Sequence, residues 1–210
     1  MPEWAQNIYI LNEKKELAKK NRIEEKMQEL NKQLEAQKRL IDEIQKYKIL
    51  LTSNGGLLED ITKTVLEELG FTILQTEKGR SDIIAKYEDT GIVAEIKGVS
   101  KSAAEKHAAQ LEKWASQYIE DNGSIPKALL IVNGFCDTPL AKRNEEVFPN
   151  QMLKYCESRG HILITTTQLL CLYIETQQNP ECKDSRIKEL LSSVGKYSRY
   201  QNIDDYLDLE

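Results

Sequence analysis

Three charged residues near the middle of the chain are the side chains best placed to do chemistry. Asp82 lies in one predicted strand, and Glu95 and Lys97 lie in the next. Side chains alternate along a strand, so Glu95 and Lys97 share one face while Ile96 points to the other. A glutamate and a lysine on a mostly buried strand are costly unless they meet a counter-ion, a metal or a polar ligand. We therefore expect these charges to form a functional group together with Asp82.

The oxygen atoms of this group predict a divalent-metal site. Mg²⁺ takes oxygen ligands and keeps several waters, so Asp82, Glu95 and the backbone carbonyl of Ile96 could hold it, or Mn²⁺ in its place. Such a metal lowers the pKa of a bound water and polarises a phosphoryl oxygen. Lys97 could orient that water or offset the charge that develops on phosphorus. The pattern thus favours metal-assisted attack of water on a phosphate ester.

The same residues also admit a purely structural interpretation. Asp82 would then be a carboxylate at a hairpin edge, and Glu95 and Lys97 a cross-strand charge set on a solvated face. His107 lies inside the apolar stripe of a predicted helix and is interpreted as a core histidine with its hydrogen bonds satisfied. Trp114, on the same helix, is interpreted as a core residue.

The elements that must position the charged group are a hairpin and the helices on either side of it. Val, Ile and Tyr-rich runs around an Asp-Thr-Gly turn predict the hairpin, and Ser102 with Glu105 has the spacing of a helix-capping box. A nearly all-apolar run after the second helix is typical of a strand buried on both faces. We expect an α/β fold with a mixed central sheet flanked by helices. The predicted helices are 57–69, 102–121, 151–158, 167–177 and 185–194, and the predicted strands are 71–76, 80–88, 92–97, 127–132 and 162–165.

Gly79-Arg80-Ser81-Asp82, followed by Glu95-Ile96-Lys97, resembles the signature of the PD-(D/E)xK nuclease superfamily. Ser81 stands where the family's name-giving proline would be. The resemblance covers about residues 57–175 and implies a restriction-endonuclease-like fold. It also implies that the hairpin carboxylates bind one or two divalent cations.

The resemblance implies further site residues on the two helices that flank the hairpin. Glu59, on the helix before it, would supply an additional metal ligand, and Gln110, on the helix after it, would lie near the metal. Arg80, immediately before Asp82, and Lys101, just after the second strand, are candidates for contacts with the nucleic-acid backbone.

The activity that follows from the resemblance is divalent-metal-dependent hydrolysis of DNA phosphodiester bonds. Host defence or DNA repair would be the usual setting, and RNA is not excluded as a substrate. The alternative is a catalytically inactive nuclease fold that serves as a scaffold, with the N-terminal helix mediating protein assembly. Metal uptake would separate the two, because the scaffold needs none.

The N-terminal region predicts a long helix and a short coiled coil. Residues 11–48 lack Pro and Gly and are rich in good helix formers. Their apolar residues recur at alternating steps of three and four, which is the heptad pattern of a coiled coil, with Gln37 filling one core position. We expect a homodimer or higher oligomer through residues 23–44, parallel or antiparallel; a single amphipathic helix packed on its own domain is the alternative. The seam residues are Ile23, Met27, Leu30, Leu34, Gln37, Ile41 and Ile44.

Length and composition set the remaining limits. The 210 residues suggest a coiled-coil segment over 1–51, a nuclease-like domain over 52–180, and a C-terminal helix with an acidic tail over 181–210. The net charge of −5 argues against a strongly basic DNA coat. No apolar run approaches the roughly 18 residues that span a bilayer. The N-terminus does not resemble a signal peptide, and the four cysteines show no metal spacing, so we expect a cytoplasmic protein without membrane contact.

Overall fold

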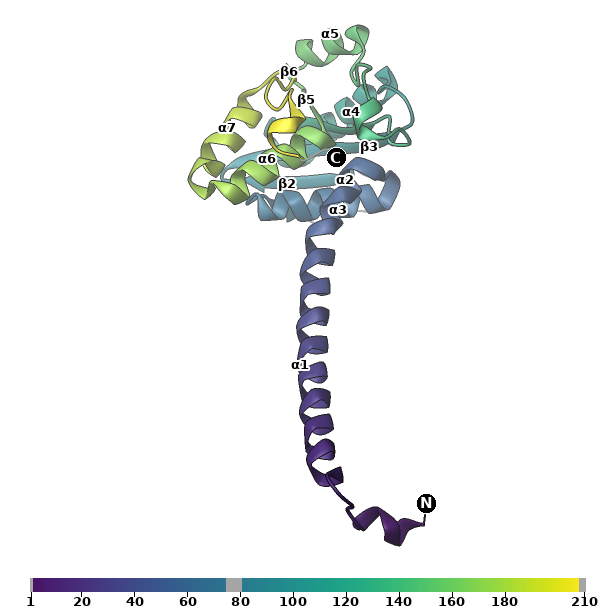
Figure 1. The fold of residues 1–210 in the computed structure, drawn as a ribbon. Helices are drawn as coiled ribbons and strands as arrows, with labels where there is room; N and C mark the ends of the chain where they lie inside the picture. The colour runs from purple at the N-terminus through teal and green to yellow at the C-terminus, as the bar shows by residue number, and fades with distance from the viewer. Residues whose placement is uncertain (1, 75–80, 208–210) are drawn as a thin grey trace. The chain divides into compact units, whose positions relative to one another are not determined.

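The computed structural model describes residues 2–74 and 81–207. The chain divides into two compact units, residues 1–46 and 47–210. The division falls a few residues before the expected boundary at residue 51. Each unit is described by itself below (Figure 1).

The N-terminal unit is almost entirely helical. A short 3₁₀ helix, η1 (Glu3–Asn7), precedes α1 (Glu13–Gln45), whose residues are nearly all good helix formers. Ion pairs one turn apart support the helix, with Lys19 Nζ 2.6 Å from Glu16 Oε1 and Lys20 Nζ 3.2 Å from Glu24 Oε1. No residue of α1 is buried, which leaves its apolar side chains in solvent. The long N-terminal helix predicted from the sequence is confirmed.

The second unit is built on a six-stranded mixed sheet with strand order β1-β2-β3-β4-β5-β6. The first three strands are antiparallel, and β3 to β6 are parallel. The strands are β1 (Thr72–Leu74), β2 (Ile83–Tyr87), β3 (Thr90–Val99), β4 (Lys127–Gly134), β5 (Ile162–Thr165) and β6 (Gly195–Lys196).

Helices cover both faces of this sheet (Figure 1). The helices are α2 (Ile49–Thr52), α3 (Gly55–Glu68), α4 (Glu105–Asn122), α5 (Asn150–Ser158), α6 (Thr166–Gln178) and α7 (Lys183–Ser192). Short 3₁₀ helices connect them: η2 (Lys46–Lys48), η3 (Leu140–Lys142), η4 (Pro180–Cys182) and η5 (Ile203–Asp205).

Strict alternation along β3 divides the hydrophobic core into two layers. Ile92, Ala94 and Ile96 pack against residues of α2, α3, α6 and α7, a side that we call the α3 face. Val93 packs against residues of α4 and α5 on the opposite side, which we call the α4 face. Because successive side chains point to opposite faces, Glu95 and Lys97 belong to the α4 face together with Val93.

The α/β class with a mixed sheet flanked by helices is confirmed. The structure adds β6, two residues long, which the sequence did not predict. Residues 181–207, predicted as a C-terminal helix and tail, contribute Ile187, Leu190 and Tyr197 to the core of the α3 face. Among the described residues, no helix combines the length and apolar character needed to cross a membrane.

Candidate active site

Asp82 lies where the pairing between β2 and β3 stops. The ladder ends at the pair Ile83 and Ala94, next to Asp82. Continuing this register by one residue places Asp82 directly across from Glu95. Instead of continuing the ladder, Asp82 accepts a hydrogen bond through its side chain, with Oδ2 2.8 Å from the backbone N of Ile96. The bond holds the Asp82 carboxylate beside β3.

The three charged residues predicted from the sequence come together on the α4 face. The Lys97 ammonium contacts Oε1 of Glu95 and lies 3.6 Å from Oδ2 of Asp82. Glu95 has no exposed side-chain surface, Asp82 is 16% exposed and Lys97 is 25% exposed. This burial is inconsistent with charges on a solvated face. The group instead is mostly buried, and only Asp82 and Lys97 keep part of their side chains exposed to solvent.

Burial and charge act on these groups in opposite directions. Burial raises the pKa of Glu95; the hydrogen bond from Lys97 opposes this, and the charge of Asp82 adds to it. Burial alone would lower the pKa of Lys97, but its contacts with Glu95 and Asp82 outweigh that effect and raise the pKa. The site therefore favours the charged form of Lys97 between the two carboxyl groups, whereas burial favours the neutral form of Glu95.

The donor set of this site fits a hard divalent cation. Neither oxygen of Glu95 has a hydrogen bond of normal geometry within the described chain, and Oε2 also lacks the contact with Lys97. Buried polar atoms without partners are rare in proteins and point to a missing water or ion. Mg²⁺ is commonly bound through one or two carboxylates with waters completing its shell. Asp82 and Glu95, with the carbonyl of Ile96, the residue after Glu95, could supply such a set.

Glu59 is not brought into a three-ligand cluster with these carboxylates. Across the described residues, no three His, Cys, Asp or Glu side chains lie close enough to hold a metal. Glu59 is on α3, which covers the α3 face, whereas Glu95 and Lys97 point to the α4 face. The start of α3 does approach β3, because a Cβ on Gly98 would lie 2.4 Å from Cβ of Asn54. A metal-binding role for Glu59 thus stays a prediction.

Helix α4 presents one stripe of side chains to the charged site. His107 is buried, and the charge of Lys97 contributes to lowering its pKa, after burial and Lys106. Trp114, seven residues further on, faces Glu95 closely enough to oppose the rise in the pKa of that carboxyl. Gln110 lies on the same stripe, one turn from each, and is half-buried. The structure thus places Gln110 on the side of α4 that faces the site.

Trp114 and His107 are neighbours of the site that the sequence analysis interpreted only as core residues. The Trp114 indole N–H is buried and has no hydrogen bond of normal geometry within the described residues. His107 Nδ1 accepts a hydrogen bond from the backbone N–H of Ala104 at 3.1 Å, so its proton is on Nε2. The interpretation of His107 as a satisfied core histidine is confirmed. The sequence did carry one signal for Trp114. The indole N–H of a tryptophan on the buried stripe of a helix needs a hydrogen-bond acceptor.

Of the two residues predicted to contact nucleic acid, Lys101 lies within the described part of the chain. Arg80 lies outside the described residues. Lys101 is exposed in the segment between β3 and α4, and its backbone carbonyl accepts a hydrogen bond from Phe135 N at 3.3 Å. That bond ties the segment after β3 to the segment after β4. The backbone of Lys101 thus lies just beyond the end of the strand that carries Glu95 and Lys97.

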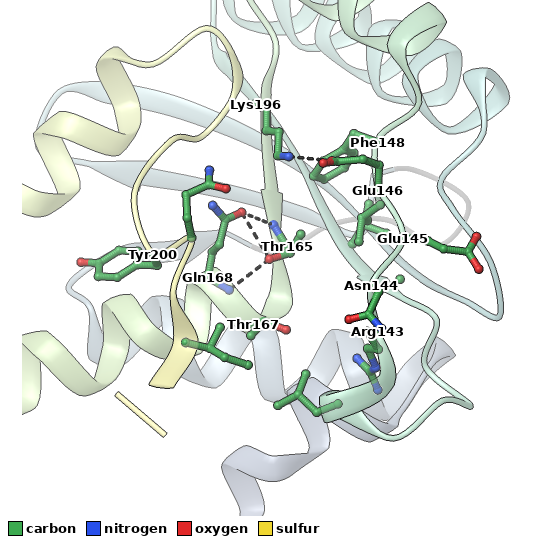
Figure 2. Close-up of a pocket in the computed structure, with 16 residues that line it drawn as sticks. Arg143, Asn144, Glu145, Glu146, Phe148, Thr165, Thr167, Gln168, Lys196 and Tyr200 are labelled. Atoms are coloured by element: carbon green, nitrogen blue, oxygen red, sulfur yellow. Dashed lines mark hydrogen bonds and ion pairs between the residues drawn. The ribbon is translucent and has the colours of Figure 1, made fainter. Parts of the chain in front are cut away.

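A cavity of about 300 Å³ lies at the ends of β4, β5 and β6 (Figure 2). Val132, on its wall, pairs in register with Lys97 on one side and Thr165 on the other. Both cations that line it are engaged: Lys196 Nζ is 2.6 Å from Glu146 Oε2, and Arg143 donates to Asn133 Oδ1 at 3.0 Å. None of the predicted site residues lines this cavity.

Comparisons with protein-family models, curated proteins and solved structures found no match. The nuclease resemblance therefore depends on the residues themselves and on their arrangement in the structure.

Proposed function

We propose that this chain is a divalent-metal-dependent nuclease of the PD-(D/E)xK type that hydrolyses DNA phosphodiester bonds. The observation that carries the proposal is the convergence of Asp82, Glu95 and Lys97 on one buried face. A structural role alone would not require two carboxylates and a lysine where all three lose hydration. The order of helices and strands around the hairpin supports a restriction-endonuclease-like fold as part of the same proposal.

Each residue has a distinct role in this mechanism. Asp82 and Glu95 would hold Mg²⁺ or Mn²⁺, with the Ile96 carbonyl as a further oxygen donor. The bound cation supplies Lewis acidity for the attack of water on phosphorus. Lys97 would place its ammonium next to the phosphate and offset the negative charge that grows in the transition state. Gln110, on the facing stripe of α4, would orient water or substrate by hydrogen bonding.

Plasmid cleavage with an isosteric variant tests this proposal. Asp82→Asn removes the carboxylate charge but keeps an oxygen that can accept the Ile96 N–H bond, so folding should be retained. We expect the wild type to cut plasmid with Mg²⁺ or Mn²⁺ and to stop with chelator. Asp82→Asn and Lys97→Ala should lose at least about 100-fold of the rate, the loss typical of removing an electrostatic catalytic group.

The matched control is Lys86→Ala, which removes an exposed lysine from the same hairpin. Thermal unfolding of every variant checks that the fold is intact. Cleavage by folded Asp82→Asn at the wild-type rate, or equal loss in Lys86→Ala, contradicts the site assignment.

Two observations favour the scaffold alternative. Lys97 already contacts both carboxylates, and the described residues contain no three-ligand cluster. Titration of Mn²⁺ followed by calorimetry separates the two functions. Uptake that Asp82→Asn abolishes supports the nuclease, and absence of uptake by the wild type supports the scaffold.

A further inference from the structure

We propose that α1 forms a parallel, in-register, two-stranded coiled coil with α1 of a second copy of this chain. In this pairing the two Gln37 side chains lie opposite each other. The sequence left orientation and strand number open. All the residues that support this pairing lie in α1, so the pairing is independent of the nuclease function.

The first argument is the exposed seam of α1. Six large apolar side chains lie along it at the heptad spacing, with exposures between 50% for Ile41 and 69% for Ile44. A repeat of 3.5 residues keeps such a row facing a second helix when both helices supercoil. A contiguous apolar row in solvent marks an interaction surface. The seam therefore fits a partner helix whose apolar residues have the same heptad spacing, and α1 of a second copy is such a helix.

The width of the seam favours two strands. In the heptad that places Met27, Leu34 and Ile41 at a, Gln37 and the other seam residues occupy d. The flanking e and g positions are polar, with Leu40 as the exception, so the apolar surface is the narrow a/d stripe of a two-stranded coil. Larger bundles would also bury these flanks. The flanking residues are Lys19, Glu24, Lys26, Asn31, Gln33, Lys38, Leu40 and Gln45.

Gln37 selects the parallel orientation. In a parallel in-register pair, d faces d, so the Gln37 amides meet and can donate to and accept from each other. In an antiparallel pair, a faces d. The antiparallel register in which every seam residue faces a position of α1 then sets Ile44 opposite Lys20 and puts Gln37 against Met27 of the second copy. There the amide would be buried against an apolar side chain, which is unfavourable without a hydrogen bond.

The charges beside the seam are compatible with this orientation. In a parallel coil, each g residue approaches the e residue five positions later on the other helix. Lys19 then meets Glu24 of the second copy, and no such pair brings like charges together. An antiparallel coil would also gain an attraction, between Glu24 and Lys38, so charge alone does not decide. The Gln37 layer does.

Cysteine cross-linking tests register and orientation directly. Gln37→Cys in the full-length chain should form a disulfide-linked dimer in mild oxidant, because the two introduced thiols lie in one layer. Lys32→Cys is the matched control, since it occupies the outward f position of the same helix. Wild type in the same oxidant accounts for the four native cysteines. We expect cross-linking of Gln37→Cys at least tenfold above both controls.

The opposite result has a defined signature. If Gln37→Cys gives no more dimer than Lys32→Cys, while a mixture of Met27→Cys and Gln37→Cys chains cross-links, the coil is antiparallel and the proposal is overturned. The second measurement is the molecular mass of the full-length chain by light scattering. A mass of two copies that falls to one in Leu30→Asp/Leu34→Asp supports the dimer. A monomeric, trimeric or tetrameric wild type overturns it.

Discussion

Glu95 is a fully buried carboxylate on a central strand, a placement that folding alone would disfavour. The structure supplies one cation, Lys97, and one neutral donor, the Trp114 indole N–H, on the side that α4 covers. The strand pattern predicted the first of these neighbours because Glu95 and Lys97 are two residues apart. Trp114 lies on α4, 19 residues after Glu95 along the chain. Its proximity depends on how α4 crosses the sheet, which spacing along one strand does not contain.

Trp114→Phe tests the contribution of the indole N–H to the site. The ring is kept, so the packing of α4 should survive, but the donor that favours the charged form of Glu95 is lost. We expect about tenfold weaker Mn²⁺ binding in calorimetry, the range typical of groups that support metal ligands. Trp4→Phe, at the only other tryptophan of the chain, is the control, since its side chain is 70% exposed. Unchanged Mn²⁺ affinity in Trp114→Phe contradicts this role.

At the scale of elements, α6 and α7 are joined by a bidentate ion pair. Arg186 Nε and Nη2 donate to Glu175 at 2.9–3.1 Å, and the Tyr200 hydroxyl also donates to this carboxylate. The Arg186 hydrogen bonds lower the pKa of Glu175, and Tyr200 adds to the effect. The pair therefore links two helices and the segment after β6.

Glu175→Gln should lower the free energy of unfolding by about 1–3 kcal/mol at neutral pH, the range for hydrogen bonds to charged groups. Because the folded-state pKa is depressed, this stabilisation is fully present above the ordinary pKa of 4.5. It is lost as pH falls below 4.5 through the lowered folded value. Urea unfolding of wild type and variant at neutral and acid pH measures the difference. Exposed Glu181→Gln is the control, and a difference that does not shrink in acid contradicts the pairing.

Most helices and strands could be predicted, because their apolar patterns are long or are bounded by turn residues. The strands β4 and β5 and the helices from α3 to α7 lie within three residues of their predicted bounds. The cap of α4 was not predicted, because the His107 side chain accepts the hydrogen bond of Ala104 N–H in place of the expected Ser102–Glu105 box. Glu59 and Lys101 were assigned from the family resemblance and from their places along the chain, and within the described residues neither side chain forms a hydrogen bond or ion pair with the charged group. The hairpin that carries the site could be predicted from the sequence, but the α4 side chains that lie next to the site could not.

The strand β6 illustrates a different limit. It has two residues, too few for any alternation, and it pairs only because the chain returns to the edge of β5. The connection that brings it there crosses the α3 face through α6 and α7, whereas α4 and α5 cross the α4 face. Since the strand order advances in one direction, the last crossover has the opposite hand to the first two. Crossovers of one hand are the rule, so sequence reasoning would not choose this path.

At the scale of the whole molecule, the chain combines a unit with its own core and a helix with none. All residues of both core layers lie in the unit 47–210, and α1 contributes no buried residue. A parallel coil would therefore tether two copies of that unit to the same end without taking part in their folding. Tethering raises the effective concentration of the second copy near a substrate bound by the first.

The fragment 47–210 tests this separation of roles. Because α1 supplies no core residue, we expect its removal to change the free energy of unfolding by less than about 1 kcal/mol, a shift of no more than about 4 °C in the melting temperature. If the nuclease proposal holds, the fragment should nick plasmid at a rate near that of the full chain. It should produce much less linear DNA, because double-strand cleavage needs two units together. Full-length Leu30→Asp/Leu34→Asp is the matched control and should behave like the fragment. A melting temperature of the fragment far below that of the full chain would show that the helix stabilises the second unit. If the fragment produced as much linear DNA as the full chain, each unit would cut both strands unaided.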